Sequence, residues 1–285
     1  MADDHEKLGD VSAFHKPAGG KDGGACLSRH QSSYAPNNSC SYRWQGSERA
    51  KGEDKTLYTY EAPDGQTIDY LEVDGYRWMD ERLISKAAHD VIASAGEKKS
   101  EKTVTKGKKK IKTEIVKKKV SSNAFRTGFA PFNNQVHHIV PVSPVIDRIN
   151  ATSRPNQAVL RPLILKGLRK ETYNINHEKN VIALPTKGKV ARNLGLPTHY
   201  GSHPNYSKQV KTLLKKAFKP YEKIVSDVGK KKHPKPMPDP ANVKAFVEKI
   251  SDTIHSQIKV NAAATKGTLR KIDDLSEDPF WGTVL

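Results

Sequence analysis

The sequence predicts an α+β protein, in which a small β-hairpin and a helix lie inside a largely helical surround. Two observations carry this prediction. Turn signals interrupt a run of β-branched and aromatic residues at 57–78, which is typical of an antiparallel hairpin in the region that precedes the central domain. Apolar residues then recur at helical spacing in 204–229 and 240–260, where they would form one face of each helix. A smaller mixed α/β region is expected to precede these helices.

Charge is distributed unevenly along the 285 residues, whose formal net charge is +18. Residues 1–95 contain 16 acidic and 11 basic side chains, a net charge of −5, so residues 96–285 carry +23. Nucleic acid is the expected partner of the basic part, because each neutralised phosphate releases counterions and adds salt-dependent affinity. A basic face that is merely soluble is the alternative that charge leaves open.

The first ten residues, MADDHEKLGD, are acidic and polar, and no run of about 18 apolar residues occurs anywhere. We therefore expect a protein made in the cytoplasm without a signal peptide and without membrane association. Cys26 and Cys40 are the only cysteines and lack Cys-x-x-Cys spacing, so a thiolate metal site is not expected. Reduced thiols are the expected state, with one disulfide as the alternative outside the cell.

The N-terminal part divides into three predicted segments. Residues 1–55 are rich in Gly, Ser, Asn and Asp without a sustained period, which predicts an irregular segment docked on the remainder. Residues 56–96 are expected to form a small hairpin followed by an amphipathic helix that Gly96 closes. Residues 97–121 place lysine clusters beside two β-prone pieces around Gly107, which predicts either a basic ribbon or a solvated linker.

A central domain is predicted at 122–228. Residues 156–173 have the pattern of an apolar helix, and residues 176–188 that of a loop, a short strand and a turn. A long amphipathic helix follows at 204–229, where Pro204 suits the first turn.

The C-terminal part contains a predicted linker and a final helix. Residues 229–240 hold four prolines and four lysines, which predicts a stiff basic linker. In the segment 241–285, a helix is expected to begin after Asp239, an N-cap residue, and Pro240, a first-turn residue. Its apolar stripe needs a partner surface in this chain or in another.

Adjacent histidines occupy the sequence VHHIVP at 136–141. In an extended strand, neighbouring side chains point to opposite faces. His137 and His138 could therefore serve different purposes, one ring facing a metal ion and the other a substrate.

A second histidine pair lies in THYGSHPNY at 198–206. His199 and His203 are one helical turn apart if this segment is helical, which would place both rings on one face, ready to chelate an ion. Tyr206 is expected in the core. His177, in NHEKN between the two pairs, is expected to be a turn residue, with replacement of a ligand as the alternative.

Together these segments resemble the HNH/endonuclease VII superfamily of ββα-metal nucleases, and within it the bacterial toxins named after an Ala-His-His motif. The resemblance covers about residues 122–226. Val136 stands where the motif name calls for Ala, a small apolar departure beside the histidine pair. The residues that carry the resemblance are His137-His138-Ile139-Val140-Pro141, Asn180-Val181-Ile182-Ala183-Leu184-Pro185 and His199-x-Gly201-Ser202-His203-Pro204-x-Tyr206.

The resemblance implies a ββα-metal, HNH-like core with defined roles. It makes His137 a metal ligand and His138 the general base, and it has His199 and His203 complete the metal site from the start of the helix. Asn180 would hold the loop that carries the base or, as in some relatives, touch the metal. One divalent ion is implied, zinc or magnesium, with nickel and manganese as alternatives.

The residue types themselves suit phosphodiester hydrolysis. Imidazole, with an unperturbed pKa of about 6.5, can accept a proton from water near neutral pH. A divalent ion can stabilise the charge that develops on the phosphate and on the departing 3′ oxygen.

We therefore expect a metal-dependent, largely non-specific DNA endonuclease that acts as an antibacterial toxin. A type VI secretion-like route would inject it into the target-cell cytoplasm, with a secretion-apparatus carrier or adaptor and a cognate acidic immunity protein as partners. An RNase of the same fold is one alternative. A non-catalytic, zinc-stabilised nucleic-acid-binding module is the other, although neither cysteine lies near the motifs.

Overall fold

The computed structural model describes residues 19–28, 35–61, 63, 65, 67–71, 103–106, 109–112, 134–199, 201–229 and 239–282. Over these residues the fold is largely helical with small two-stranded sheets, so the predicted α+β class is confirmed. In this part of the chain, no helix combines the length and the apolarity that a membrane crossing requires. The helix predicted to end at Gly96 and most of the linker predicted at 229–240 lie outside the described residues.

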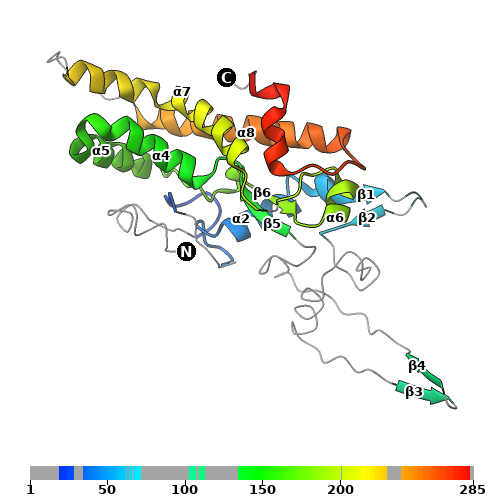
Figure 1. Cartoon of the computed structure of the whole chain (residues 1–285). Coiled ribbons are helices and arrows are strands. Elements are labelled where there is room, and N and C mark those ends of the chain that lie inside the picture. The colour runs from blue at the N-terminus through cyan, green and yellow to red at the C-terminus, as the bar shows by residue number, and fades with distance from the viewer. Residues whose placement is uncertain are drawn as a thin grey trace.

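An antiparallel pair of strands lies at the centre of the molecule (Figure 1). It joins β5 (Asn134–His138) to β6 (Val181–Pro185), and His137 faces Ile182 in the register. All five residues of β6 are buried, as expected for a continuous apolar strand that is covered on both faces. The histidine pair at the end of β5 is therefore held in the interior by its partner strand.

Four helices pack together beside this pair (Figure 1). They are α4 (Val142–Ser153), α5 (Gln157–Lys170), α7 (Pro204–Gly229) and α8 (Pro240–Ala264). The helices predicted in the regions of α5, α7 and α8 are confirmed, and α8 buries its stripe within its own chain, against α5 and α7.

Helix α4 follows the histidine motif directly and was not predicted. Pro141 and Pro144 interrupt its sequence, but they occupy the N-cap and the first turn of the helix. A missing N–H is harmless there, because the first N–H groups of a helix have no partner within it.

The prediction that residues 1–55 are irregular is wrong for Tyr42–Lys51, which form helix α2. The Oγ atom of Ser41 caps this helix by accepting a hydrogen bond from the Trp44 N–H (3.4 Å). Several of its buried side chains are polar, including Gln45 and Arg49, so the helix carries no apolar period that the sequence could reveal. A Cβ at Gly46 would lie 2.7 Å from Val136, because α2 packs closely on β5.

Two short hairpins lie in the N-terminal half, and residues 72–78 of the predicted hairpin region lie outside the described residues. Strand β1 (Thr59–Glu61) pairs with β2 (Thr67–Asp69) across the predicted Pro-Asp-Gly turn. Strand β3 (Thr103–Lys106) pairs with β4 (Lys109–Lys112), and the rest of the lysine-rich segment 97–121 lies outside the described residues.

Short helices complete the fold, and one core joins its parts. Buried apolar residues from Ala25 to Phe280 belong to a single cluster. Gly195 ends α6 with a left-handed φ of 70°, and a Cβ there would clash with the backbone of α8 at Ala262. The short elements are η2 (Lys55–Tyr58), η4 (Arg154–Asn156), η5 (Glu178–Asn180), α6 (Gly188–Leu194), η6 (Ile272–Glu277) and η7 (Pro279–Gly282).

Candidate metal centre

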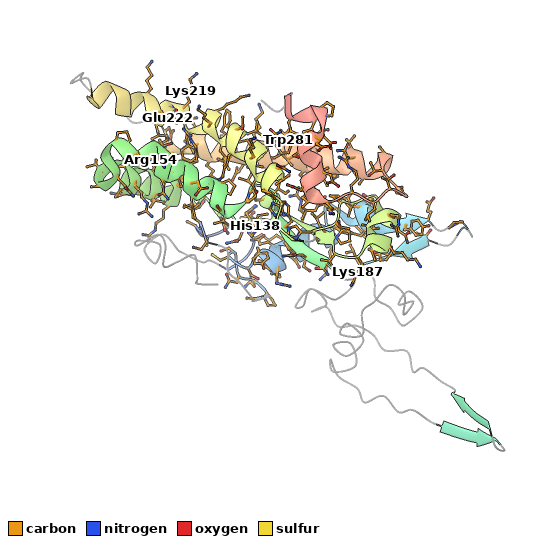
Figure 2. The ribbon with its side chains drawn as sticks, viewed as in Figure 1. His138, Arg154, Lys187, Lys219, Glu222 and Trp281 are labelled. Atoms are coloured by element: carbon orange, nitrogen blue, oxygen red, sulfur yellow. The ribbon has the colours of Figure 1, made fainter. Side chains whose placement is uncertain are left out.

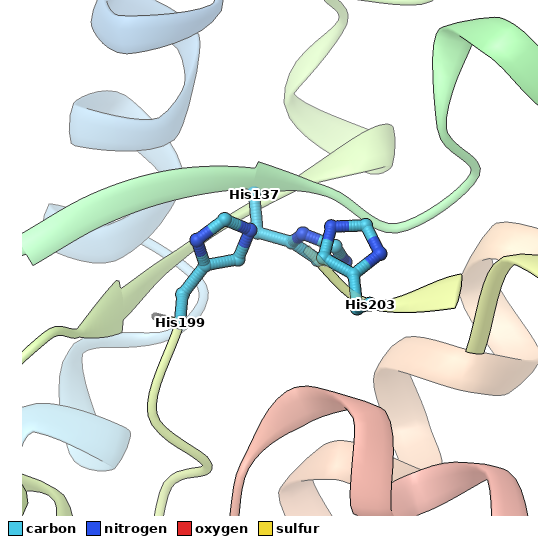
Figure 3. Close-up of side chains that lie close together, drawn as sticks. All are labelled: His137, His199 and His203. Carbon is cyan, nitrogen blue, oxygen red and sulfur yellow. The ribbon is translucent and has the colours of Figure 1, made fainter. Parts of the chain in front are cut away.

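Three histidine side chains from separate parts of the chain turn toward one another (Figure 3). His137 comes from β5, His199 from the loop after α6, and His203 from the residue before α7. Their rings lie 4.8 Å (His137 to each of the others) and 5.2 Å (His199 to His203) apart between centroids. One nitrogen of each ring lies within 4.8 Å of the others, so the three residues, here called the histidine triad, could hold one metal ion.

The condition for a helical spacing of His199 and His203 is not met, because neither residue lies in a helix. The backbone N–H of His199 donates to the Pro185 carbonyl (2.9 Å), which ties the loop to the end of β6. Gly201 then turns the chain with a left-handed φ of 81°. The His203 carbonyl accepts the N–H of Ser207 (3.1 Å), so His203 is the residue immediately before α7. A loop with a glycine turn therefore brings the two rings together.

Half-buried partners orient two rings of the triad. Gln135 Oε1 lies 2.8 Å from Nδ1 of His199, and an amide oxygen can only accept, so this nitrogen carries the proton. The lone pair of the neutral His199 ring then lies on Nε2, as in many metal-bound histidines whose other nitrogen is hydrogen-bonded. Nδ1 of His203 contacts the Ser207 hydroxyl at 3.3 Å.

Tyr206 forms a wall of the triad and belongs to the core, as predicted. Its fully buried ring meets His137 edge-on at 5.3 Å and His203 at 5.7 Å between centroids. Its hydroxyl donates to the Ile139 carbonyl, which joins α7 to the end of β5. Burial raises the pKa of this phenol well above its ordinary value, so the hydroxyl stays a donor.

His138 points to the other face of β5, as the alternation of a strand predicts. Figure 2 shows it near the middle of the molecule, between the helices above it and the N-terminal elements below it. Its Nε2 lies 2.9 Å from Oδ1 of Asn176, and its ring packs against Tyr42 of α2 at 5.0 Å. Asn176 was not predicted as a site residue, since an asparagine in the loop-like NHEKN segment is typical of a turn.

Asn180 holds the backbone that follows His138. Its Oδ1 accepts from the Val140 N–H (2.8 Å), and its Nδ2 donates to the carbonyls of Val140 (3.0 Å) and Ile175 (2.8 Å). Its own carbonyl accepts from the Ile139 N–H (2.8 Å). Of the two roles that the resemblance implied for Asn180, these contacts correspond to holding the loop.

His177 caps η5 and does not join the triad. Its Nδ1 accepts from the Lys179 N–H (3.2 Å), and its Nε2 lies 3.3 Å from a carboxylate oxygen of Asp22. These contacts are those of a turn residue, as expected.

A second polar cluster, missed by sequence reasoning, lies between α2 and α8. Asp54 Oδ2 accepts from Nε2 of His255 (2.9 Å) and lies 3.2 Å from Nε of Arg49. Lys259 approaches the other carboxylate oxygen at 3.5 Å. Burial acts to raise the pKa of Asp54, but the hydrogen bond from His255 and the charges of Arg49 and Lys259 together hold this pKa below its ordinary value of 3.8. The ligand atoms of Glu53, Asp54 and His255 also lie close enough to one another to hold a metal ion.

The donor set of the triad fits a transition-metal ion. Imidazole nitrogens suit zinc, nickel and related ions, and three protein ligands leave at least one position for water or substrate, as in catalytic centres. No carboxylate belongs to the triad, so its ligands leave the charge of a divalent ion uncompensated. Such a centre would attract a phosphate.

The comparisons with known proteins concern the same part of the chain. A family model described as AHH, a nuclease family of the HNH/ENDO VII superfamily with conserved AHH, matches residues 119–233. No curated protein and no solved structure matches the chain. The matched residues contain the histidine triad, His138 and Asn180.

Proposed function

Because residues 119–233 belong to AHH, a nuclease family of the HNH/ENDO VII superfamily, we propose that the protein is a metal-dependent endonuclease that hydrolyses DNA. The observation that carries this proposal is the arrangement of histidines on β5. His137 faces the other rings of the triad, while His138 occupies the opposite face of the same strand. Strand β5 thereby places the proposed metal ligand on one face and the proposed general base on the other.

The triad would hold one divalent ion, and its imidazole donors favour zinc or nickel, with magnesium and manganese, which prefer oxygen ligands, as alternatives. When bound, the ion supplies Lewis-acid stabilisation to the phosphate oxygens and to the departing 3′ oxygen. Gln135 fixes the His199 ring, and Tyr206 packs on the other two rings, so the ligands are oriented before metal or substrate binds.

His138 acts in this proposal as the general base that takes a proton from the attacking water. Its ring is nearly buried and fixed between Asn176 and Tyr42, so it would not have to be ordered during the reaction. Asn180 holds the backbone at 139–140, and so keeps the end of β5 in place.

The charge distribution supports a nucleic-acid substrate. Residues 96–285 carry a net charge of +23, which favours binding to a phosphate backbone regardless of base sequence. A nuclease with little sequence preference would damage the cell that makes it. We therefore propose an antibacterial toxin that a secretion-apparatus carrier or adaptor delivers into the target-cell cytoplasm, and that an acidic immunity protein neutralises in the producer.

Digestion of plasmid DNA tests the proposed activity. The full-length protein is incubated with plasmid and with structured RNA, in the presence of each candidate metal or of a chelator. We expect metal-dependent cleavage of plasmid, and a loss of roughly 100-fold to 10,000-fold in His138→Ala, as is typical when a general base is removed.

The control for this experiment is His177→Ala, which removes a histidine of the η5 turn and should retain activity. Intact plasmid under every metal, or full activity of His138→Ala, contradicts the proposal. Cleavage of RNA alone would reassign the substrate.

A further inference from the structure

A chain of hydrogen bonds connects His138 to a part of the protein outside the family match. Nε2 of His138 lies 2.9 Å from Oδ1 of Asn176, and Nδ2 of Asn176 donates to the Ser28 carbonyl (2.8 Å). All three residues are buried. Ser28 ends the described segment 19–28, which lies more than 90 residues before the family match begins at residue 119.

The chain also fixes the direction of each hydrogen bond. A main-chain carbonyl can only accept, so the NH₂ group of Asn176 must face Ser28 and its oxygen must face His138. An amide oxygen accepts, so Nε2 of His138 carries a proton. In the neutral ring the lone pair then lies on Nδ1, and a general-base role for His138 would use this nitrogen.

Hydrogen bonds between main-chain atoms anchor the segment that contains Ser28 to the segment that contains Asn176. The N–H of Cys26 donates to the Tyr173 carbonyl (3.0 Å), and the Cys26 carbonyl accepts from the Ile175 N–H (2.8 Å). These bonds form a parallel bridge beside Asn176, so the Ser28 carbonyl is held at a defined place. Tyr42 of α2 covers the ring of His138 from the same N-terminal part.

We propose that Asn176 is a positioning residue for His138, and that residues 24–28 orient the Asn176 amide through the Ser28 carbonyl. This inference rests on the proposed role of His138 as the general base. It adds that the N-terminal part of the chain completes the catalytic arrangement, so the family-matched region depends on residues outside it for full activity.

Replacing the amide tests the inference in the full-length protein. Asn176→Leu keeps a side chain of similar size but removes both hydrogen bonds, while Asn176→Asp keeps an oxygen that can accept from His138. We expect kcat on plasmid to fall about 10-fold to 100-fold in Asn176→Leu, the usual range for a residue that orients a functional histidine, with KM unchanged. Asn176→Asp should retain more of kcat than Asn176→Leu.

Tyr58→Phe is the matched control. Tyr58 is fully buried, and its hydroxyl donates to the Ala183 carbonyl (3.0 Å), a hydrogen bond that involves neither Asn176 nor Ser28. Its loss should lower Tm as Asn176→Leu does but leave kcat close to that of the unmodified protein. Affinity for Zn²⁺, measured by calorimetry, should be unchanged in all three variants, because the triad lies on the other face of β5.

The ring of His138 provides a second readout that needs no variant. Nitrogen-15 NMR of the metal-free, unmodified protein at about pH 8, where an ordinary imidazole is neutral, should show the proton of His138 on Nε2. Asn176→Leu should lose this preference.

The outcomes separate this inference from the proposed function. Equal losses of kcat in Tyr58→Phe and Asn176→Leu, or a proton on Nδ1 in the unmodified protein, overturn the positioning role. If His138→Ala is inactive while Asn176→Leu is fully active, only the positioning role fails. If His138→Ala remains fully active, the proposed general base fails, and the inference fails with it.

Discussion

Among the residues that the structure describes, two groups that contain buried histidines meet the distance requirement for a metal ion, and they differ in charge. In the cluster at His255, both ring nitrogens already form hydrogen bonds, one with the guanidinium of Arg49 and the other with the carboxylate of Asp54. Nη2 of Arg49 lies 2.8 Å from Nδ1 of His255, and a guanidinium can only donate, so Nε2 must donate to Asp54. The histidine triad instead contains three imidazoles and no carboxylate.

This difference shows that charge balance, and not proximity, distinguishes the two clusters. An ion at Asp54 would have to displace the cations of Arg49 and Lys259, which already compensate the carboxylate. Arg49 also donates to the Glu178 carbonyl (2.8 Å), so the cluster connects α2, η5 and α8. We therefore interpret it as a structural network, and the triad as the metal centre.

Removing one ring from each cluster tests this comparison most strongly. His137→Ala should abolish tight binding of Zn²⁺ and lower plasmid cleavage about 1,000-fold, because Lewis-acid stabilisation is worth several kcal/mol. His255→Ala should keep the stoichiometry of Zn²⁺ in calorimetry while lowering Tm. If His255→Ala no longer binds Zn²⁺, or if His137→Ala binds it as tightly as the unmodified protein, the assignment of the triad as the metal centre is wrong.

Asp54→Asn probes the structural network and should lower the free energy of unfolding by about 3–5 kcal/mol, since it leaves a buried cation without its carboxylate. Urea unfolding measures this change, and Zn²⁺ affinity should stay constant. A loss below about 1 kcal/mol would show that solvent already compensates these charges.

The same network predicts a pH dependence with a defined sign. The pKa of Asp54 is lowered in the folded state, so the unfolded chain binds the proton first as the pH falls. The stabilisation from Asp54 is fully present well above pH 3.8, the ordinary value, and is lost as the pH falls through the lower, folded-state pKa. Urea unfolding of Asp54→Asn at several pH values should show a free energy of unfolding that lacks this acid-dependent loss.

Tyr206→Phe should have the smallest effect. It keeps the ring that packs on His137 and His203 but removes the hydrogen bond to the Ile139 carbonyl, which costs about 1 kcal/mol of unfolding free energy. Zn²⁺ affinity should change little. A large loss of affinity would show that this hydroxyl, and not the ring, fixes the position of the triad.

Periodicity explains which parts of the fold could be predicted. Helices α7 and α8 and strand β6 each bury an apolar face or run, so their sequences carry a signal of their own. Helix α2 buries polar side chains such as Gln45 and Arg49, whose partners lie in distant segments, and it was missed. Asn176 and the network at Asp54 were missed for the same reason, because their hydrogen-bond partners lie in distant segments.

The sequence by itself determined that His137 and His138 face opposite sides, because side-chain alternation is a property of any strand. It also placed all three triad histidines among the candidate ligands. Only the tertiary structure decided that a glycine turn joins His199 to His203, and that Ser28 and Arg49 support the histidines at 138 and 255. These contacts join residues as far as 206 positions apart, and packing of the whole chain, rather than local periodicity, brings them together.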